Sequence, residues 1–423
     1  MFPLHDRTRR QLTNLLFLLL AVAPTLATVG LCMVRRLPSH ARQAAEAIGL
    51  RLGLKATLAT VRYPQPGSAV YEGLELADPA TGQVVLRCRR AEARRQTLAD
   101  SEKQAREFLV LSVSGVEIEP PGGSELSQLV ERALAGRLSD GCLRIKAEDP
   151  VSLKTAGGMF ALAEVEGHIE SLARGTWVGV AFRPADRADG GRAAICLTRD
   201  RRSSAPVLCL DIDTGGHALP CSLLAPNGGL LAGLGPEATF QGILQADRTA
   251  DCWSGQISAE IAGIDLATVL APIAPGQLSG RGRLTLETAR FRAGRLEMAR
   301  GALAAENGTI GPELVATASR GLGLQTAASP REPQPYRQLG FGFQIEGGRI
   351  EVQGRCPVGN SQPAAVAVGP AGPILGPQDR PQPIATLAES LVPAGSPAAA
   401  LLAYFPDAAP SVAARDAQSV QKR

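Results

Sequence analysis

Three cysteines and one histidine in the middle of the chain are of the residue types that bind metal ions. Cys196, Cys209, His217 and Cys221 are separated by twelve, seven and three intervening residues. Structural zinc sites usually contain a pair of ligands only about two to four residues apart. These spacings contain no CxxC pair, so they favour buried or disulfide-linked cysteines over a metal site. The pairing of the cysteines stays open.

Two pairs of acidic residues have the spacing at which carboxylates share one face of a β-strand: Glu164 with Glu166, and Asp211 with Asp213. Paired carboxylates perform acid–base catalysis in many enzymes. The solvated face of a strand gives the same pattern, and we favour that interpretation. The chain has only four histidines and contains neither a GxSxG nor an HExxH motif. We therefore expect a protein that is not an enzyme, with no catalytic residues, no metal and no cofactor.

The segment Leu278 to Gly311, LSGRGRLTLETARFRAGRLEMARGALAAENGTIG, is rich in arginine and glycine. A phosphate-binding loop has a further glycine and a Lys-Ser/Thr ending and leads into a helix, and this segment has none of these. A site for single-stranded nucleic acid needs aromatic residues to stack on bases, and only Phe291 stands among these arginines. The whole chain has 44 basic and 40 acidic residues, a net charge of +4. We therefore expect no nucleic-acid partner.

The same segment alternates apolar and charged residues, as a β-strand does when one of its faces is covered. Gly294 is placed to form a turn, and Asn307-Gly308 is the sequence of a two-residue hairpin. The arginines fall largely opposite the apolar residues and form the solvated face. The apolar face must be covered by protein or by an apolar ligand. This candidate groove face consists of Leu284, Leu286, Phe291, Leu296 and Met298.

Short alternating runs recur along the chain between Gly, Pro and Asp turn signals, and residues 51–92 predict two or three antiparallel strands. The predicted helices are short: one over residues 38–49, one over 124–136 and one that starts near Asp265. The fold class is therefore mainly β with a few short helices. Its antiparallel strand–turn repeats are expected to form a curled sheet or groove.

Residues 15–34 form an uncharged apolar run of about 20 residues, long enough to cross a membrane as a helix. We expect an uncleaved signal anchor, and the alternative is a signal peptide cleaved near Ala27. Because the arginines on the two sides of the run nearly balance, the orientation is taken from the commoner arrangement, in which the bulk of the chain is translocated.

From residue 361 onward the chain is rich in Pro, Ala and Gly, a composition typical of disorder. The predicted organisation is an N-terminal tail and transmembrane anchor at 1–36, a β-rich domain at 37–360 and a disordered tail at 361–423.

Two stretches resemble the AsmA-like family of bacterial envelope proteins. The first, residues 51–92, contains PGSAVYEGLELADPATG, and the second, residues 257–318, contains LSGRGRLTLETARFRAGRLEMARGALAAENGTIG. In that family a membrane span precedes motifs similar to these. The resemblance implies an anchor in the inner membrane, a β-rich groove in the periplasm, and a link to lipid transport and outer-membrane integrity. It implies no catalytic residues.

These features predict a non-catalytic envelope protein that is anchored in the inner membrane through residues 15–34, with the bulk of the chain in the periplasm. We expect it to bind or transfer membrane lipid, or to support outer-membrane biogenesis, with envelope proteins as further partners. The alternative is a structural or interaction protein whose strands close as a β-sandwich without a lipid groove.

Overall fold

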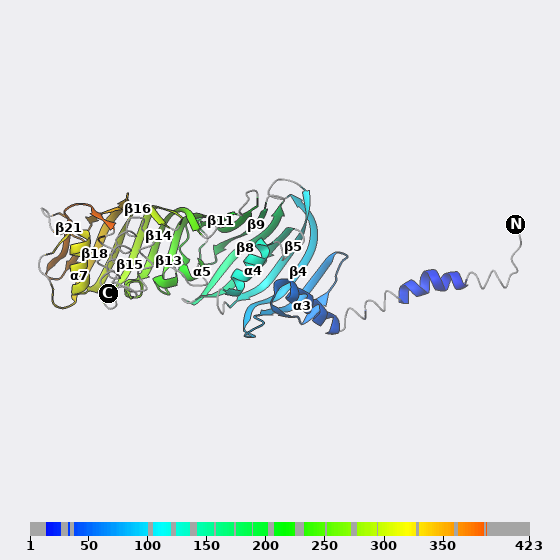
Figure 1. Cartoon of the computed structure of the whole chain (residues 1–423). Helices are drawn as coiled ribbons and strands as arrows, with labels where there is room; N and C mark the ends of the chain where they lie inside the picture. The colour runs from blue at the N-terminus through cyan, green and yellow to red at the C-terminus, as the bar shows by residue number, and fades with distance from the viewer. Residues whose placement is uncertain are drawn as a thin grey trace, which may run out of the picture.

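One curled sheet makes up most of the structure, which is a computed structural model (Figure 1). The structure describes most of the residues of the chain. These are residues 14–26, 33, 38–99, 105–119, 124–135, 142–155, 158–172, 175–187, 189–201, 207–224, 232–249, 252–271, 277–293, 295–326, 330–358, 363–384 and 386.

The described strands follow one another across the sheet in nearly the order of the sequence. The first half comprises β1 (Lys55–Thr57), β2 (Thr60–Arg62), β3 (Ser68–Ala77), β4 (Val84–Ala99), β5 (Ala105–Ile118), β6 (Cys142–Ala147), β7 (Val151–Thr155), β8 (Gly158–Leu172), β9 (Gly175–Pro184), β10 (Ala193–Asp200) and β11 (Val207–Asp213). The second half comprises β12 (Leu219–Pro220), β13 (Thr239–Thr249), β14 (Cys252–Asp265), β15 (Arg281–Arg292), β16 (Arg295–Ile310), β17 (Leu324–Thr326), β18 (Gln334–Glu346), β19 (Arg349–Gly354), β20 (Ala367–Gly369), β21 (Gly372–Gln378) and β22 (Gln382–Pro383).

The helices are short, and most connect strands of the sheet. The three predicted ones are confirmed as α3, α4 and α6, and the sequence analysis missed α7. The helical elements are η1 (Leu18–Val22), α3 (Pro38–Leu52), α4 (Ser124–Leu134), α5 (Cys221–Leu224), η2 (Ala232–Leu234), α6 (Leu266–Leu270) and α7 (Pro312–Leu322).

None of the helices in the described part of the chain combines the length and the apolarity that crossing a membrane requires. The predicted span at residues 15–34 lies partly outside the described residues. Within it, the six residues from Leu15 to Leu20 are all exposed.

Antiparallel pairing of neighbours in the sequence builds the sheet, as predicted. Two long ladders run through β8–β9–β10–β11 and through β13–β14–β15–β16, and the pairs β11–β13 and β16–β18 extend them. Among the described pairs, β5 alone pairs in parallel, with β6 and β7. Parallel neighbours need a crossover connection, and α4 lies on the connection from β5 to β6.

The strands bury one face and leave the other to solvent, which is the reason for their alternating sequences. Gly115 in β5 has a positive φ of 60°, a backbone conformation that glycine adopts readily. A Cβ atom at residue 115 would lie 2.8 Å from the Cβ of Arg89 on the next strand. The two buried residues of β5 are Phe108 and Val116, and β5 keeps one register with β4 on both sides of Gly115.

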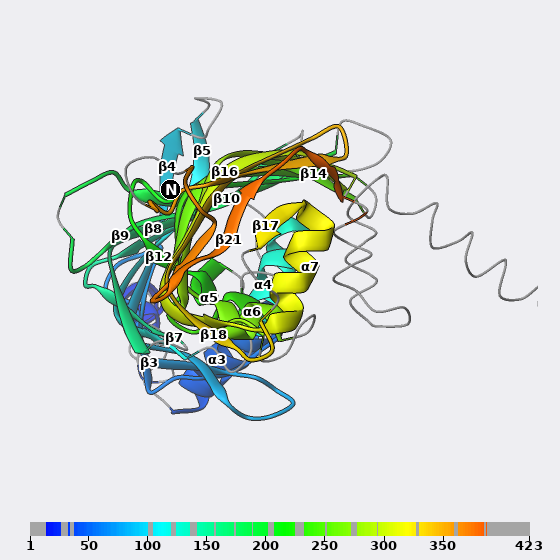
Figure 2. The ribbon, with the colours of Figure 1, turned by 90° about the vertical axis from the view of Figure 1, so that its left-hand side faces the viewer.

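The sheet curls into a C in end view, and α4, α5, α6 and α7 lie on its concave side (Figure 2). α5, α6 and α7 lie on connections at the rim where β11, β14 and β16 end. α4 lies on the crossover from β5 to β6, and the carbonyl oxygen of Leu134 at its end accepts a hydrogen bond from Arg201, just after β10 at the opposite rim. At the opposite rim the strands of β8–β9, β13–β14 and β15–β16 follow each other with at most three intervening residues. The helices on the concave side therefore contact both rims of the sheet.

Two clusters of buried side chains form the core on this concave side. One is centred on β3–β9 and includes Phe182, which is 2% exposed. The other runs from β11 to β22 and contains Val315 of α7, 1% exposed. Ile195 and Leu224 pack against both clusters, so the core is continuous.

The prediction of a disordered tail from residue 361 is wrong for residues 363–384. This stretch forms β20, β21 and β22 and contributes Val366, Leu375 and Ile384 to the core. Its strands are held by β18, β17 and β19, which lie far from them in the sequence, so its composition alone did not indicate order. Residues 387–423 lie outside the described residues.

The predicted hairpin at Asn307-Gly308 is also wrong, because both residues lie inside β16. Asn307 has the positive φ of 53° that the pair suggested, but the chain continues straight along β18. β15 ends at Arg292 and β16 begins at Arg295, and Ala293, which follows β15, has a φ of 50°. Gly294 itself lies outside the described residues.

Candidate functional site: the concave apolar face

The concave face carries two adjacent rows of apolar side chains that run across the strands. Directly paired residues point to the same side of a sheet, so the register defines each row. The first apolar row crosses nine strands, about 38 Å at about 4.8 Å per strand. The first apolar row is Leu143, Ile169, Val178, Leu197, Leu210, Ala246, Gly255, Phe291 and Leu296. The second apolar row, nearer the helices, is Ile145, Gly167, Val180, Ile195, Ile212, Leu244, Ile257, Ala289 and Ala299.

Protein covers the second row more completely than the first. In the second row Ile212 is buried, and Val180, Ile195 and Leu244 pack against the core. In the first row, Leu210 is the one large side chain within the described core clusters. The others are half-buried: Leu143, Ile169, Val178, Leu197, Phe291 and Leu296.

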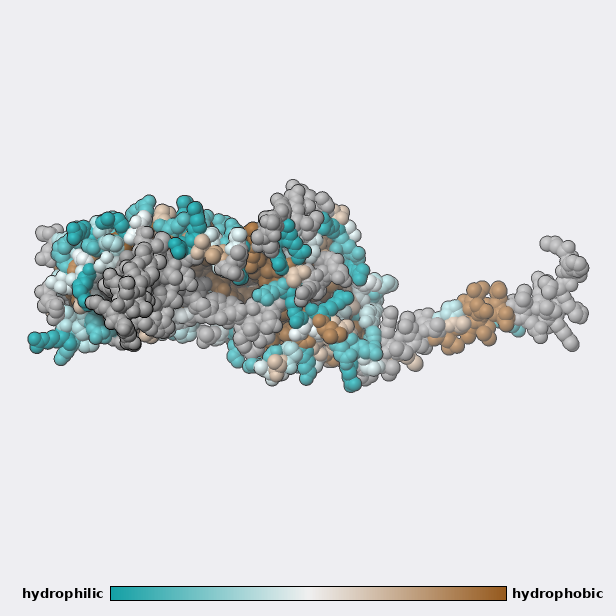
Figure 3. All heavy atoms as spheres, viewed as in Figure 1, coloured by the Kyte–Doolittle hydropathy of each residue, from teal (hydrophilic) through white to brown (hydrophobic). Residues whose placement is uncertain are grey.

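Apolar residues gather in a hollow near the middle of the molecule on the side shown in Figure 3. Large apolar patches that remain accessible in a folded protein usually mark a binding surface. The first apolar row is therefore the candidate site.

Beyond the first row, towards the rim with tight turns, the concave face becomes partly polar. The third row, here called the rim row, has Arg199, Leu208 and Arg248 in direct register. Trp253 pairs with Arg248 and is half-buried. The rim row as a whole is Ser171, Thr176, Arg199, Leu208, Arg248 and Trp253.

Four of the five residues predicted for the apolar face lie on the concave side. Leu284 packs against the core, Leu286 is half-buried, and Phe291 and Leu296 end the first apolar row. Met298 does not belong with them.

Met298 pairs with Arg290 and with Glu346, both exposed residues of the convex face. The register shifts between Phe291–Leu296 and Arg290–Met298, which leaves Glu297 as an extra residue. One extra residue moves the following side chain to the other face.

The convex face is charged and solvated, as the sequence predicted. Glu164 and Glu166 pair with Arg183 and Arg192 at 3.4 and 3.0 Å. Asp211 and Asp213, the other predicted pair, are both exposed. Cross-strand pairs such as Arg283–Glu260, at 3.2 Å, continue the pattern.

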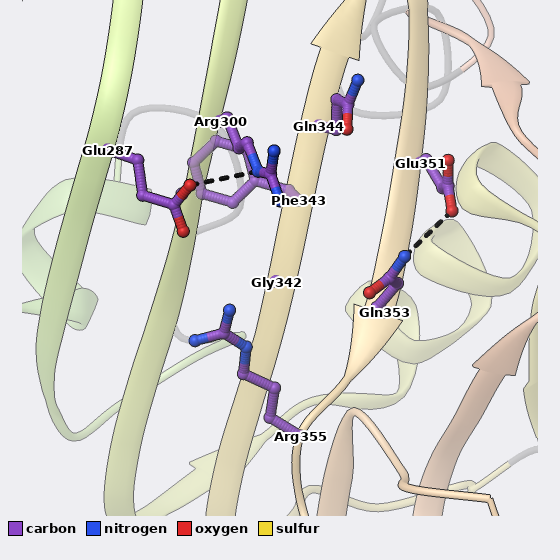
Figure 4. A pocket seen from close by; sticks show the side chains of 9 residues that line it. Glu287, Arg300, Gly342, Phe343, Gln344, Glu351, Gln353 and Arg355 are labelled. Atoms are coloured by element: carbon purple, nitrogen blue, oxygen red, sulfur yellow. Dashed lines mark hydrogen bonds and ion pairs between the residues drawn. The ribbon is translucent and has the colours of Figure 1, made fainter.

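A small polar depression interrupts the convex face above Gly342. Figure 4 shows Arg300 pairing with Glu287, at 3.1 Å, and Arg355 lying beside the glycine. The depression holds about 70 Å³. It is lined by exposed side chains of the solvated face and adds no second site.

The cysteines and His217 that opened the sequence analysis do not form a site. Cys196 and Cys209 lie on the convex side of β10 and β11 as free thiols, paired in register with Asp211 and Thr198. Burial, together with the neighbouring Asp247, raises the pKa of the Cys209 thiol to about 12. A thiol with that pKa is a poor nucleophile at neutral pH.

His217 bonds instead to the backbone oxygen of Gly191, with 2.7 Å from its Nε2 atom. Cys221, buried in α5, is likewise a free thiol. No cluster of metal-binding residues occurs in the part of the chain that the structure describes.

The sequence analysis missed the part of the face on β6 to β11 and the two arginines of the rim row. The signal was present, because AAICLTRD places Ile195, Leu197 and Arg199 on one side of a strand. What the sequence lacked was the register that aligns this strand with its neighbours.

Comparison of the chain with protein-family models, with curated proteins and with solved structures finds no match.

Proposed function

We propose that this chain is a non-catalytic, AsmA-like envelope protein that shelters the acyl chains of membrane lipids on its concave face. The first apolar row carries this proposal. It is continuous across nine strands, apolar at every position, and half-buried at every position except the buried Ala246. Covering such a row with hydrocarbon stabilises the complex by about 0.8 kcal/mol for each buried CH₂ group.

We also propose a location for the protein in the cell envelope. It is anchored in the inner membrane through residues 15–34, and the sheet lies in the periplasm. The uncharged run of these residues supports the anchor. In that position the concave face receives lipid from the membrane, for transfer or for outer-membrane biogenesis, with envelope proteins as further partners.

The alternative was a structural protein whose strands close as a β-sandwich. A sandwich has two sheets whose inner faces cover each other. The described strands instead pair into one sheet, and short helices lie on its concave side. This arrangement favours the groove over the sandwich.

Photo-crosslinking tests the proposal directly. The full chain, purified in detergent and stripped of lipid, is mixed with a phospholipid that carries a photoreactive group at the end of an acyl chain. After illumination, peptides that gained lipid mass are mapped by mass spectrometry. We expect crosslinks on the first apolar row, for example at Val178 and Leu197, and none on the convex face at Ile243.

Two matched variants complete the test. Leu197→Glu introduces a charge into the first apolar row and should reduce crosslinking at least about 10-fold, because burying the charge against hydrocarbon is unfavourable. Ile243→Glu makes the same change on the convex face, where the side chain is 47% exposed, and should leave crosslinking unchanged. Circular dichroism confirms that both variants fold. Crosslinks scattered over both faces, or none at all, would refute lipid binding at this site.

A further inference from the structure

One histidine of the convex face has a buried ring nitrogen that makes no hydrogen bond. His168 lies on β8, and its Nε2 atom has no partner among the residues that the structure describes. His168 pairs in register with Gly179 of β9, which pairs in turn with Cys196 of β10. A Cβ atom at residue 179 would lie 2.5 Å from this nitrogen and 3.2 Å from the Cys196 sulfur. The imidazole ring therefore fills a slot that exists because residue 179 is glycine.

Trp177 of β9 forms one wall of this slot. The centroid of its ring lies 4.1 Å from that of the His168 ring, with 56° between the two planes. Burial raises the pKa of the Cys196 thiol, and a hydrogen bond with Trp177 opposes the increase in this pKa. His168, Trp177 and Cys196 are thus in contact across three strands, and together they are called the histidine cluster here.

The histidine cluster lies directly behind the candidate site. Each of its three members is followed in the sequence by a residue of the first apolar row, namely Ile169, Val178 and Leu197. Successive residues of a strand point to opposite faces, so the same three strands carry the cluster on one face and the row on the other. A loss of packing at the cluster therefore also affects the strands that present the row.

The slot suits a neutral imidazole better than an imidazolium. Burial is the main reason that the pKa of His168 lies below its usual value, while Glu170 raises this pKa and Arg144 lowers it. In the protonated ring both nitrogens are donors, and the donor at Nε2 would be buried without an acceptor. The titratable or charged residues that face the ring are Arg144 and Lys146 of β6, Glu166 and Glu170 of β8, Cys196 of β10 and Asp211 of β11. On β9 the nearest residues of this face are Trp177, Gly179 and Ala181, which do not titrate.

We infer that His168 is a pH-sensitive latch. While neutral, its ring holds β8, β9 and β10 together from the slot, and protonation in mild acid moves the ring into water and loosens the strands that carry the first apolar row. The inference goes beyond the proposed function and holds whether or not lipid occupies the row. Because the folded-state pKa of His168 is lowered, the stabilisation by the neutral ring is fully present above the unfolded pKa of about 6.5 and is lost as the pH falls towards the lower folded value.

Two measurements on the full chain, purified in detergent, test the latch between about pH 8 and pH 5. The chain has two tryptophans, so a Trp253→Phe background leaves Trp177 as the single emitter. We expect its emission to shift to longer wavelength below about pH 6, because the ring beside it is replaced by water. Hydrogen exchange, corrected for the intrinsic rate, should show the amides of β8 to β10 opening at least about 3-fold more often at about pH 5.5 than at about pH 7.5.

Three variants assign these changes to the ring. His168→Phe keeps a ring against Trp177 but takes up no proton, so both changes should disappear. His168→Gln also lacks a titrating group and gives the same comparison if the phenylalanine variant does not fold. His40→Gln is the matched control, because it removes a half-buried histidine whose Nε2 atom lies 3.0 Å from the Tyr63 hydroxyl, and it should leave both changes as in the wild type. Circular dichroism at about pH 8 confirms that each variant is folded.

Three outcomes would overturn the inference. Emission that weakens in acid without shifting would show that the imidazolium stays in the slot. Changes of equal size in the wild type and in both His168 variants would assign them to other groups. No change in either measurement down to about pH 5 would show that protonation does not displace the ring. None of these measurements involves lipid, so the crosslinking experiment decides lipid binding separately.

Discussion

At the scale of single residues, the position of Tyr336 explains the Asn-Gly pair that resembled a hairpin turn. Tyr336 is 2% exposed, and its hydroxyl donates a hydrogen bond to the backbone oxygen of Ser279 at 2.6 Å. Gly308 is its direct partner on β16. A Cβ atom at residue 308 would lie 2.1 Å from that same oxygen and 2.4 Å from the tyrosine hydroxyl.

Gly308→Ala should therefore destabilise the protein by about 1–3 kcal/mol, since the new methyl group forces a buried aromatic ring and a strand to separate. The midpoint of urea-induced unfolding measures this change. Gly233→Ala is the control, because a Cβ atom there has nothing within 4 Å, and it should shift stability by no more than about 0.5 kcal/mol. Equal midpoints for both variants would contradict the packing described for Tyr336.

The residues of the candidate face show how far sequence alone reaches. The alternation predicted Leu284, Leu286, Phe291 and Leu296 correctly because a strand repeats every two residues. It placed Met298 on the wrong face, because a bulge adds one residue to β16 and no local signal marks Glu297 as the extra residue. The arginines of the rim row were visible as residues, but their alignment depends on register between strands about 50 positions apart.

At the scale of elements, Asp265 stabilises α6 as the residue that caps its N-terminus. The side chain of Asp265 accepts hydrogen bonds from the backbone nitrogen of Ala267, at 3.1 Å, and from the hydroxyl of Thr268, at 2.5 Å. The Thr268 hydroxyl is the main reason that the pKa of Asp265 lies below its usual value. The helix positions Leu266, 4% exposed, against the core.

Asp265→Ala should reduce the free energy of unfolding by about 1 kcal/mol at neutral pH, and Asp265→Asn by much less, since asparagine also caps helices. Because the folded-state pKa of Asp265 is lowered, its contribution is present above the unfolded pKa of about 3.9 and is lost as pH falls through the lower folded value. As the pH is lowered, the difference in the free energy of unfolding between the wild type and Asp265→Asn should therefore become smaller. A difference that does not change with pH would contradict the role of the carboxylate.

Helices were predictable where a cap and a stop framed them, as for α4 and α6. The signals of α7 were also present, with Pro312 in its first turn and Gly323 in the left-handed conformation at its end. They were missed because α7 stands between two long strands and its buried face includes small residues such as Thr317 and Gly321. Its importance comes from tertiary packing, which local pattern does not record.

At the scale of the whole molecule, the two faces contribute differently to stability. The ion pairs of the convex face are largely solvent-exposed, and pairs of that kind contribute about 0–1 kcal/mol each and are screened by salt. The buried side chains of the concave side hold the curl. A curled sheet was predictable from the repeated strands and turns. The part of the sheet formed by residues 363–384 was not, because these residues pair with strands that are distant in the sequence.

Raising the salt concentration from about 0.05 to 1 M NaCl should therefore shift the melting temperature by less than about 4 °C. Phe182→Ala, which removes a side chain that is 2% exposed, should reduce stability by about 3–5 kcal/mol. Thermal melts followed by circular dichroism measure both. A large loss of stability in high salt would mean that the charged face maintains the curvature.

The near match between the order of strands in the sheet and their order in the sequence has a consequence for assembly. Each strand from β8 to β16 finds its main partner in the strand just made, so little loop entropy opposes each step. We expect such a chain to fold strand by strand during synthesis, before its C-terminus is complete. Among the described strands, β20 to β22 are synthesised last, and they complete the C-terminal end of the sheet after the other strands have paired.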